Sequence, residues 1–92
     1  MPEAKYCFST RWLTTCKVDP KILGHCREDI RLTLLQHEIE ARPVWKPMHL
    51  QPLYAGTTYH GVGYDEQLFE QGLCLPSSSD MTNEQQSEVI AV

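Results

Sequence analysis

The sequence predicts a small α+β domain, in which a largely antiparallel sheet carries helices packed on one face. Three observations point to this class: apolar residues alternate along one early segment, recur at helical spacing in the next, and three prolines then fall within ten positions. Strands are expected at residues 6–18, 39–44 and 73–75. With 92 residues the chain is expected to form one domain, residues 1–92, that buries about 60 to 65% of its unfolded surface.

The first expected strand, residues 6–18, is assigned from its alternating side chains. A period of two places Trp12, Cys16 and Val18 on one face, which is expected to be buried. Pro20 has no backbone donor and ends the pattern. The segment is therefore interpreted as a half-buried strand.

The next segment is interpreted as a connection followed by a helix. Residues 21–26 form the connection, with Gly24 as its flexible point, and residues 27–38 form the helix. Two acidic residues in the first turn suit the positive end of the helix dipole. Cys26 is a poor N-cap, and the loss of a hydroxyl cap costs about 1 kcal/mol.

The proline-rich segment, residues 39–54, cannot form a regular helix, because each proline removes a donor and favours an extended residue before it. It is expected to be a short strand followed by a rigid, bent connection. Four side chains in this segment could together bind an anionic, ring-bearing ligand. They are the forked donor Arg42, the flat ring of Trp45, the point charge of Lys46 and the titratable ring of His49. The same residues equally fit packing and a solvated rim.

The remaining residues, 55–92, are expected to form a loop, two helices and a short strand. Residues 55–63 contain three glycines and are interpreted as a loop. Asp65 is expected to cap a short helix that Gly72 ends. Thr82 opens the last helix, because a glutamine follows it at capping-box spacing. The residues expected to pack from that helix are Val89 and Ile90.

Composition excludes several classes of function. The formal net charge is -4 and no basic stripe is present, so nucleic acid is not an expected partner. No run approaches the roughly 20 apolar residues of a membrane span, and no signal peptide is recognised. A cytoplasmic location is therefore expected. The four cysteines lack Cys-x-x-Cys spacing, so free buried thiols and no metal site are expected.

No catalytic residue can be assigned from motifs. The chain has no glycine-rich phosphate loop before a helix, and its four histidines show no metal-like spacing. The serines at 77–79 stand in a polar turn without a neighbouring histidine, which favours a solvated loop over a nucleophile. Lys46 is interpreted as a solvated or rim lysine rather than a reactive amine.

The segment Arg-Pro-Val-Trp-Lys-Pro-Met-His-Leu-Gln-Pro, residues 42–52, resembles the small C-terminal domain of the DegT/DnrJ/EryC1/StrS family. This family comprises pyridoxal phosphate-dependent aminotransferases that act on nucleotide-linked sugars. Four further stretches resemble family segments in the same order: residues 10–16, 27–32, 68–77 and 82–85. The resemblance covers nearly the whole chain but only about the last quarter of a typical member.

The resemblance implies a supporting role on the substrate side of an active-site cleft. By position in the matched motif, the candidate substrate-binding residues are Arg42, Trp45, Lys46 and His49. Weaker candidates, from the first matched stretch, are Arg11 and Trp12. Core packing for the tryptophans and a structural ion pair for Arg42 are the alternatives.

The resemblance also implies what this chain lacks. The Schiff-base lysine of the family lies in the large domain, so no pyridoxal phosphate is expected in this chain and no activity from it alone. Residues 1–6 resemble the interior of family members, which indicates a truncated or separately encoded piece. The expected partners are the missing large catalytic domain or a homodimer partner, together with a nucleotide-sugar.

Two alternatives remain open. The chain is also compatible with a free-standing interaction module whose apolar surface binds itself or another protein. A third reading is that it binds a sugar nucleotide unaided.

Overall fold

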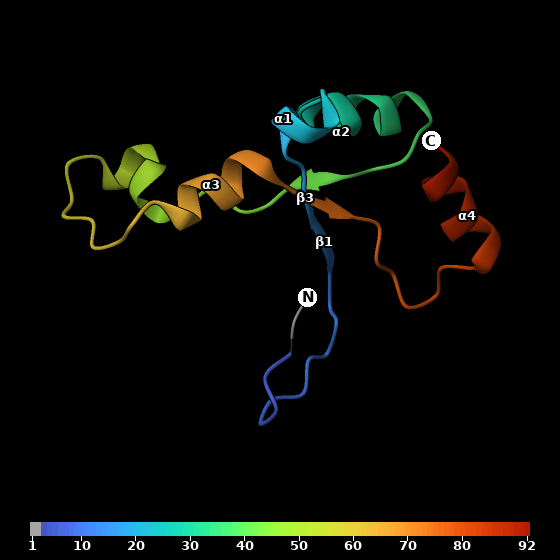
Figure 1. Ribbon diagram of the computed structural model, residues 1–92, viewed down its shortest axis with the longest axis horizontal. Coiled ribbons are helices and arrows are strands. Elements are labelled where there is room, and N and C mark those ends of the chain that lie inside the picture. Colours follow the sequence, from blue (N-terminus) through green and yellow to red (C-terminus); the bar gives the residue numbers. More distant parts are fainter. Residues whose placement is uncertain (1–2) are drawn as a thin grey trace.

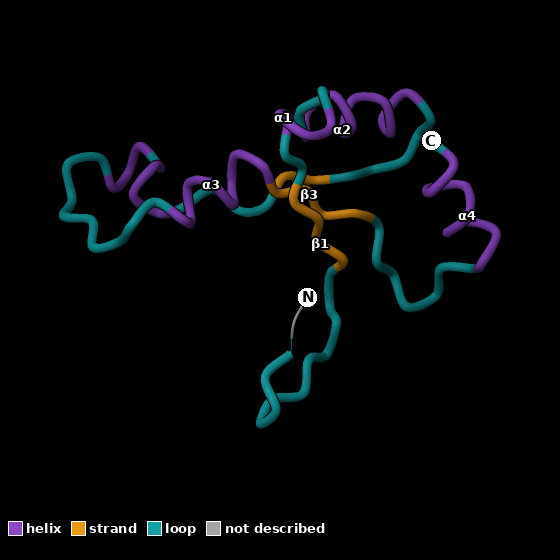
Figure 2. Tube along the Cα trace, in the orientation of Figure 1, coloured by secondary structure: helices purple, strands orange, loops and turns teal. Residues whose placement is uncertain are grey.

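The computed structural model describes residues 3–92 and confirms the α+β prediction (Figures 1 and 2). A three-stranded antiparallel sheet is accompanied by four α-helices and two short 3-10 helices within these residues. Met1 and Pro2, which belong to the segment that suggested an internal start, lie outside the described residues. The elements are β1 Thr14–Lys17, α1 Pro20–Leu23, α2 Arg27–Gln36, β2 Arg42–Pro43, η1 Met48–Leu50, η2 Pro52–Tyr54, α3 Tyr64–Gln71, β3 Gly72–Leu75 and α4 Asn83–Ala91.

The sheet has the order β1-β3-β2, so the last strand in sequence is the central one. Thr14 of β1 pairs with Leu75 of β3, and Arg42 of β2 pairs with Cys74 of β3. The outer strands are shorter than predicted. Residues 6–13 are not a strand, because Arg11 has a φ of 51° and leaves the extended region. The second strand is reduced to two residues, since Pro43 has no N–H to donate to the ladder.

The buried core lies between α2 and one face of the sheet. Leu34 of α2, Ala41 and Leu73 form it, and Leu73 is completely buried. Four half-buried residues pack around this cluster: Ile30, Ile39, Leu75 and Val89. The predicted packing of Val89 is thus confirmed.

Three expectations about burial are wrong. Trp12 and Cys16, assigned to the buried face of the first strand, are exposed, and only Val18 of that set is buried. The chain turns out of the extended conformation before it reaches Trp12, which breaks the assumed alternation. Ile90 is also exposed, because only one line of α4 reaches the core.

Local hydrogen bonds account for the helix boundaries. The connection expected after β1 contains the helix α1, which the sequence reading missed: the Asp19 carboxylate accepts from the Lys21 N–H at 3.0 Å. At the start of α2 the Asp29 carboxylate accepts from the Cys26 N–H at 2.7 Å, which partly compensates for the weak cap. Asp65 is not the cap of α3. Gly63 holds that position with a φ of 81°.

The molecule is extended rather than compact. Its Cα radius of gyration is 15.6 Å, whereas a compact domain of this length has about 12 Å. Its accessible surface is 7758 Å², against about 5,500 Å² for a compact monomer of 10.6 kDa. In Figure 1 the arm formed by η1, η2 and α3 projects away from the sheet, as does the N-terminal segment. The extra accessible surface of about 2,300 Å² therefore results from this extended arrangement of the elements.

The four cysteines are free, but only Cys74 is buried, so the expectation of buried thiols is wrong for Cys7, Cys16 and Cys26. Among residues 3–92, no group of three or more His, Cys, Asp or Glu side chains is arranged so that it could hold a metal ion. None of the helices in the described part of the chain combines the length and apolarity needed to span a bilayer.

Candidate functional site

The face of the sheet opposite α2 carries a cavity of about 350 Å3. Leu73 points into the core beside α2, so Cys74, the next residue of β3, points to the other face. Arg42 is the cross-strand partner of Cys74 and shares that face. The cavity is lined by these two residues together with Trp12 and Trp45.

The two tryptophans come from different segments and meet at this cavity. Trp12 precedes β1 and Trp45 follows β2, and their ring centroids lie 5.8 Å apart with planes tilted by 31°. This distance is within the range of favourable aromatic pairs. Trp12 is 72% exposed and Trp45 is 63% exposed, so neither is the packed core residue that the alternative interpretation required.

Arg42 stands at the mouth of the cavity in an ion pair. Its guanidinium donates from Nε to Oε1 of Glu40 at 2.8 Å, and a second nitrogen lies 2.6 Å from the same oxygen. Both side chains are largely exposed, so the pair adds little to stability. Glu40 also lines the cavity and was not singled out from the sequence.

The other sequence candidates lie elsewhere. Lys46 is exposed, and its backbone carbonyl accepts from the Gln51 side chain at 3.1 Å. Arg11 lies in the N-terminal segment, where a guanidinium nitrogen is 3.4 Å from a carboxylate oxygen of Glu3. The structure therefore brings Arg42, Trp45 and Trp12 together at the cavity. The side chains of Lys46 and Arg11 do not line it.

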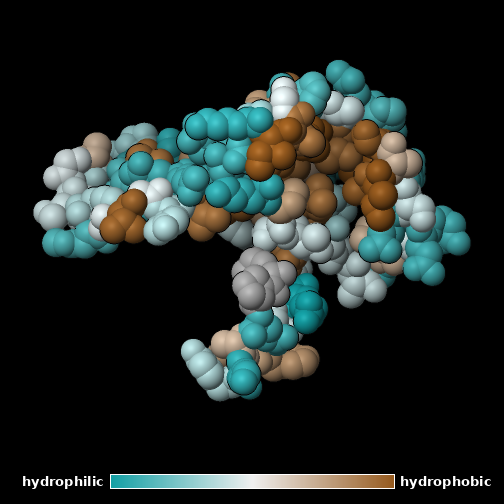
Figure 3. Space-filling view, viewed as in Figure 1, coloured by the Kyte–Doolittle hydropathy of each residue, from teal (hydrophilic) through white to brown (hydrophobic). Residues whose placement is uncertain are grey.

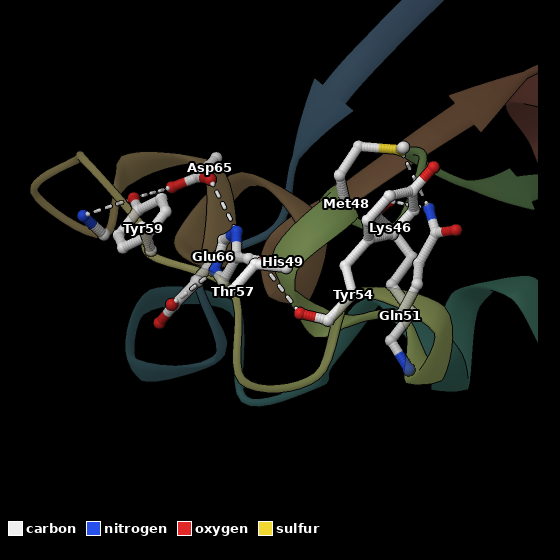
Figure 4. A network of polar contacts seen from close by, with 10 residues as sticks. Lys46, Met48, His49, Gln51, Tyr54, Thr57, Tyr59, Asp65 and Glu66 are labelled. Atoms are coloured by element: carbon white, nitrogen blue, oxygen red, sulfur yellow. Dashed lines mark hydrogen bonds and ion pairs between the residues drawn. The ribbon is translucent and has the colours of Figure 1, made fainter.

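His49 belongs to a second cluster, on the projecting arm (Figure 4). Its Nε2 lies 2.8 Å from Oε1 of Glu66, and its Nδ1 lies 3.5 Å from Oδ2 of Asp65. The ring stacks on Tyr59 with a centroid separation of 4.0 Å. Both ring nitrogens thus face carboxylates, and the half-buried imidazole links η1 to the start of α3.

Tyr59 closes the loop of residues 55–63 onto this cluster. Its hydroxyl donates to Oδ1 of Asp65 at 2.5 Å and accepts from the Gly63 N–H at 3.2 Å. The ring lies so close to Gly61 that a Cβ there would meet the Tyr59 side chain. The sequence of this loop had indicated no function for it. Nothing in local spacing indicated that His49 would meet a tyrosine ten residues away.

The hydrogen bond from Tyr59 lowers the pKa of Asp65 below its ordinary value, and the same bond raises the pKa of the Tyr59 phenol. A carboxyl with a depressed folded pKa contributes stability above its unfolded pKa of about 3.9. That contribution is lost as the pH falls through the folded pKa. Acid is therefore expected to release the loop.

Replacing Tyr59 by phenylalanine is expected to raise the pKa of Asp65 towards its ordinary value, because the hydroxyl donor is removed while the ring stays. The pKa is measured by following the side-chain carboxyl carbon of Asp65 by NMR as the pH changes. Tyr64→Phe is the matched control, since Tyr64 is exposed. An unchanged Asp65 titration in Y59F would disprove the contact.

Sequence comparisons identify related proteins. The model of the DegT/DnrJ/EryC1/StrS aminotransferase family matches residues 2–92. EpsN of Bacillus subtilis (strain 168), named provisionally as a pyridoxal phosphate-dependent aminotransferase, is 42% identical over 96 residues, which cover 100% of this chain and 24% of EpsN. GDP-perosamine synthase of Escherichia coli O157:H7 is 34% identical over 83 residues, which cover 90% of this chain and 22% of that enzyme. The chain thus spans about a quarter of the length of these relatives.

Proposed function

Because the chain belongs to the DegT/DnrJ/EryC1/StrS aminotransferase family, we propose that it forms the substrate-side C-terminal part of a pyridoxal phosphate-dependent aminotransferase acting on nucleotide-linked keto-sugars. The observation that carries this proposal is the family match over residues 2–92, combined with coverage of only a quarter of each relative. On this proposal the chain is inactive alone and works with a large catalytic domain.

The residues present do not fit pyridoxal phosphate itself. When bound, this cofactor supplies an electron sink, and it is held through a lysine, an acid beside the pyridine nitrogen and a phosphate cradle. All four lysines of this chain are exposed, at positions 5, 17, 21 and 46. None of them lines the cavity that Trp12 and Trp45 border. We therefore assign none of the cofactor's chemistry to these residues.

The part that these residues can play is to hold and orient the substrate. Arg42 offers a fork of N–H donors and Trp45 a flat ring, both at the same cavity. His49 and Lys46 are kept as proposed substrate-side residues, on the ground of their place in the family motif. Since His49 lies apart from the tryptophan cavity, its contribution would come from the arm.

The surface of the chain supports a large protein partner. A stable interface typically buries about 800 Å² on each side, and the surplus here is about 2,300 Å². In Figure 3, hydrophobic side chains gather on the part of the surface near α2 and α4, whereas the projecting arm is mostly hydrophilic. Docking onto a catalytic domain, or onto a second subunit that contains one, would cover such a surface.

We place this function in the cytoplasm. All four cysteines are free, although three of them are exposed and available for oxidation. Free exposed thiols are the usual state in a reducing compartment.

The test is reconstitution of transaminase activity. The chain alone, with pyridoxal phosphate, glutamate and a UDP- or GDP-linked keto-sugar, is expected to form no 2-oxoglutarate. Adding the part of EpsN that this chain does not match is expected to give more turnover than that part alone. Turnover by the isolated chain, or no gain on mixing together with no complex by light scattering, would refute the proposal.

A second candidate is a self-associating module, favoured by large apolar side chains that stay in solvent. Ile22 is 87% exposed and Leu53 is 83% exposed. Self-association would bury such residues without any catalytic domain. Light scattering on the pure chain decides: a mass that rises with concentration supports this candidate, and a constant monomer mass at high concentration excludes it.

A further inference from the structure

The two indoles form an open aromatic surface above a cavity. Trp12 and Trp45 touch each other, yet more than 60% of each side chain stays exposed, and Cys74 is buried beneath the cavity they border. Exposed tryptophan faces take up flat ligands whose own faces are apolar. The arrangement therefore suits a ring that lies against an indole.

The size of the cavity limits the ligand to about one ring. Its volume is about 350 Å3, near the lower end of the range of about 300 to 1,000 Å3 that small-molecule pockets occupy. A complete nucleotide-linked sugar is too large to be enclosed here. One ring of such a molecule, or one unit of a saccharide, is of suitable size.

The charges at the mouth favour an uncharged ring. Arg42 is already paired with Glu40 at 2.6 Å, so the two charges compensate each other, and the whole chain carries a net charge of -4. A phosphate would have to compete with the Glu40 carboxylate for the guanidinium. Hydroxyl groups need no such exchange, because they donate to a carboxylate and accept from a guanidinium at the same time.

We propose that Trp12 and Trp45, with Arg42 and Glu40 at the mouth, form a binding site for the pyranose ring of an uncharged saccharide. The apolar C–H face of the ring lies on an indole, and the hydroxyls on its edge bond to the ion pair. The ring comes either from a free saccharide or from the sugar end of a nucleotide-linked sugar. The second source rests on the proposed function, and the first does not.

The experiment follows the indole N–H signals of the labelled, full-length chain by NMR during titrations with methyl β-glucopyranoside, UDP and UDP-glucose. The chain has only two tryptophans, so both indole signals report on this site. Methyl β-glucopyranoside is expected to shift them and to saturate in the millimolar range, while UDP leaves them unchanged. A shift with UDP-glucose as well identifies the sugar end of the nucleotide as a source, and no shift with it identifies a free saccharide.

Three variants make the test specific. Trp45→Ala is expected to weaken glucoside binding about tenfold or more, since one stacking face is lost, with Trp12 as the remaining reporter. Trp45→Phe, which keeps a flat ring, is expected to retain most of the affinity. His60→Ala is the matched control, because His60 is exposed and does not line the cavity, and it is expected to bind normally. Amide signals of the core around Leu73 establish that each variant is folded.

Two results would overturn the proposal. If UDP shifts the indoles and methyl β-glucopyranoside does not, the tryptophans take a nucleobase. If no probe shifts them in the folded chain, the pair is a surface for protein contact. Neither result depends on transaminase turnover, so failure of this site and failure of the proposed function are distinguished by separate measurements.

Discussion

Replacing Leu73 by alanine is expected to lower the free energy of unfolding by about 2 to 5 kcal/mol. Leu73 is completely buried in the central strand and contacts the cluster that includes Leu34 and Ala41. A domain of this length has a total stability of about 5 to 14 kcal/mol. Because the core is so small, this single substitution removes a large share of it. Urea unfolding followed by circular dichroism measures the difference.

The matched control is Leu53→Ala, the same chemical change at a side chain that is 83% exposed. It is expected to change the unfolding free energy by less than about 0.5 kcal/mol. If L73A and L53A cost the same, the assignment of the core between α2 and β3 would be wrong.

Replacing Gly72 by alanine is expected to cost about 1 to 3 kcal/mol through crowding. Gly72 starts β3 directly after α3, and its φ of -87° is open to any residue, so backbone freedom is not the reason for glycine here. A Cβ would collide with the Leu68 carbonyl oxygen and would lie 2.5 Å from Cγ2 of Val44. The carbonyl is part of the α3 backbone, which cannot move without loss of helix hydrogen bonds. Urea unfolding again gives the cost.

A double-mutant cycle with Val44→Ala separates the two contacts at Gly72. Removing the valine methyls is expected to recover part of the cost of G72A, because the contact with the Leu68 carbonyl remains. Wild-type stability in the single variant G72A would show that the helix and strand do not approach as closely as described.

Part of the candidate site could be predicted from the sequence, and part of it could not. Arg42 and Trp45 were selected from one proline-rich motif, and they do share a cavity. Their neighbour Trp12 was a weaker candidate from another stretch, and Glu40 was not selected at all, because only the order β1-β3-β2 brings these segments to one face. His49 comes from the same motif but lies with Tyr59, Asp65 and Glu66, since η1 and η2 carry the chain away from the sheet.

Local sequence patterns were enough to predict several elements: helix α2 from its apolar spacing, β3 from its brief apolar run and α4 from the capping box at Thr82. They also predicted that the prolines prevent a regular helix, and only the short 3-10 helices η1 and η2 form there. These elements depend on interactions between residues that are close in sequence, so the spacing of residue types is enough to predict them. Which apolar residues are buried and which polar groups meet could not be predicted in this way. Trp12 is exposed and Tyr59 reaches His49 because of pairings between distant segments, whose geometry local periodicity does not encode.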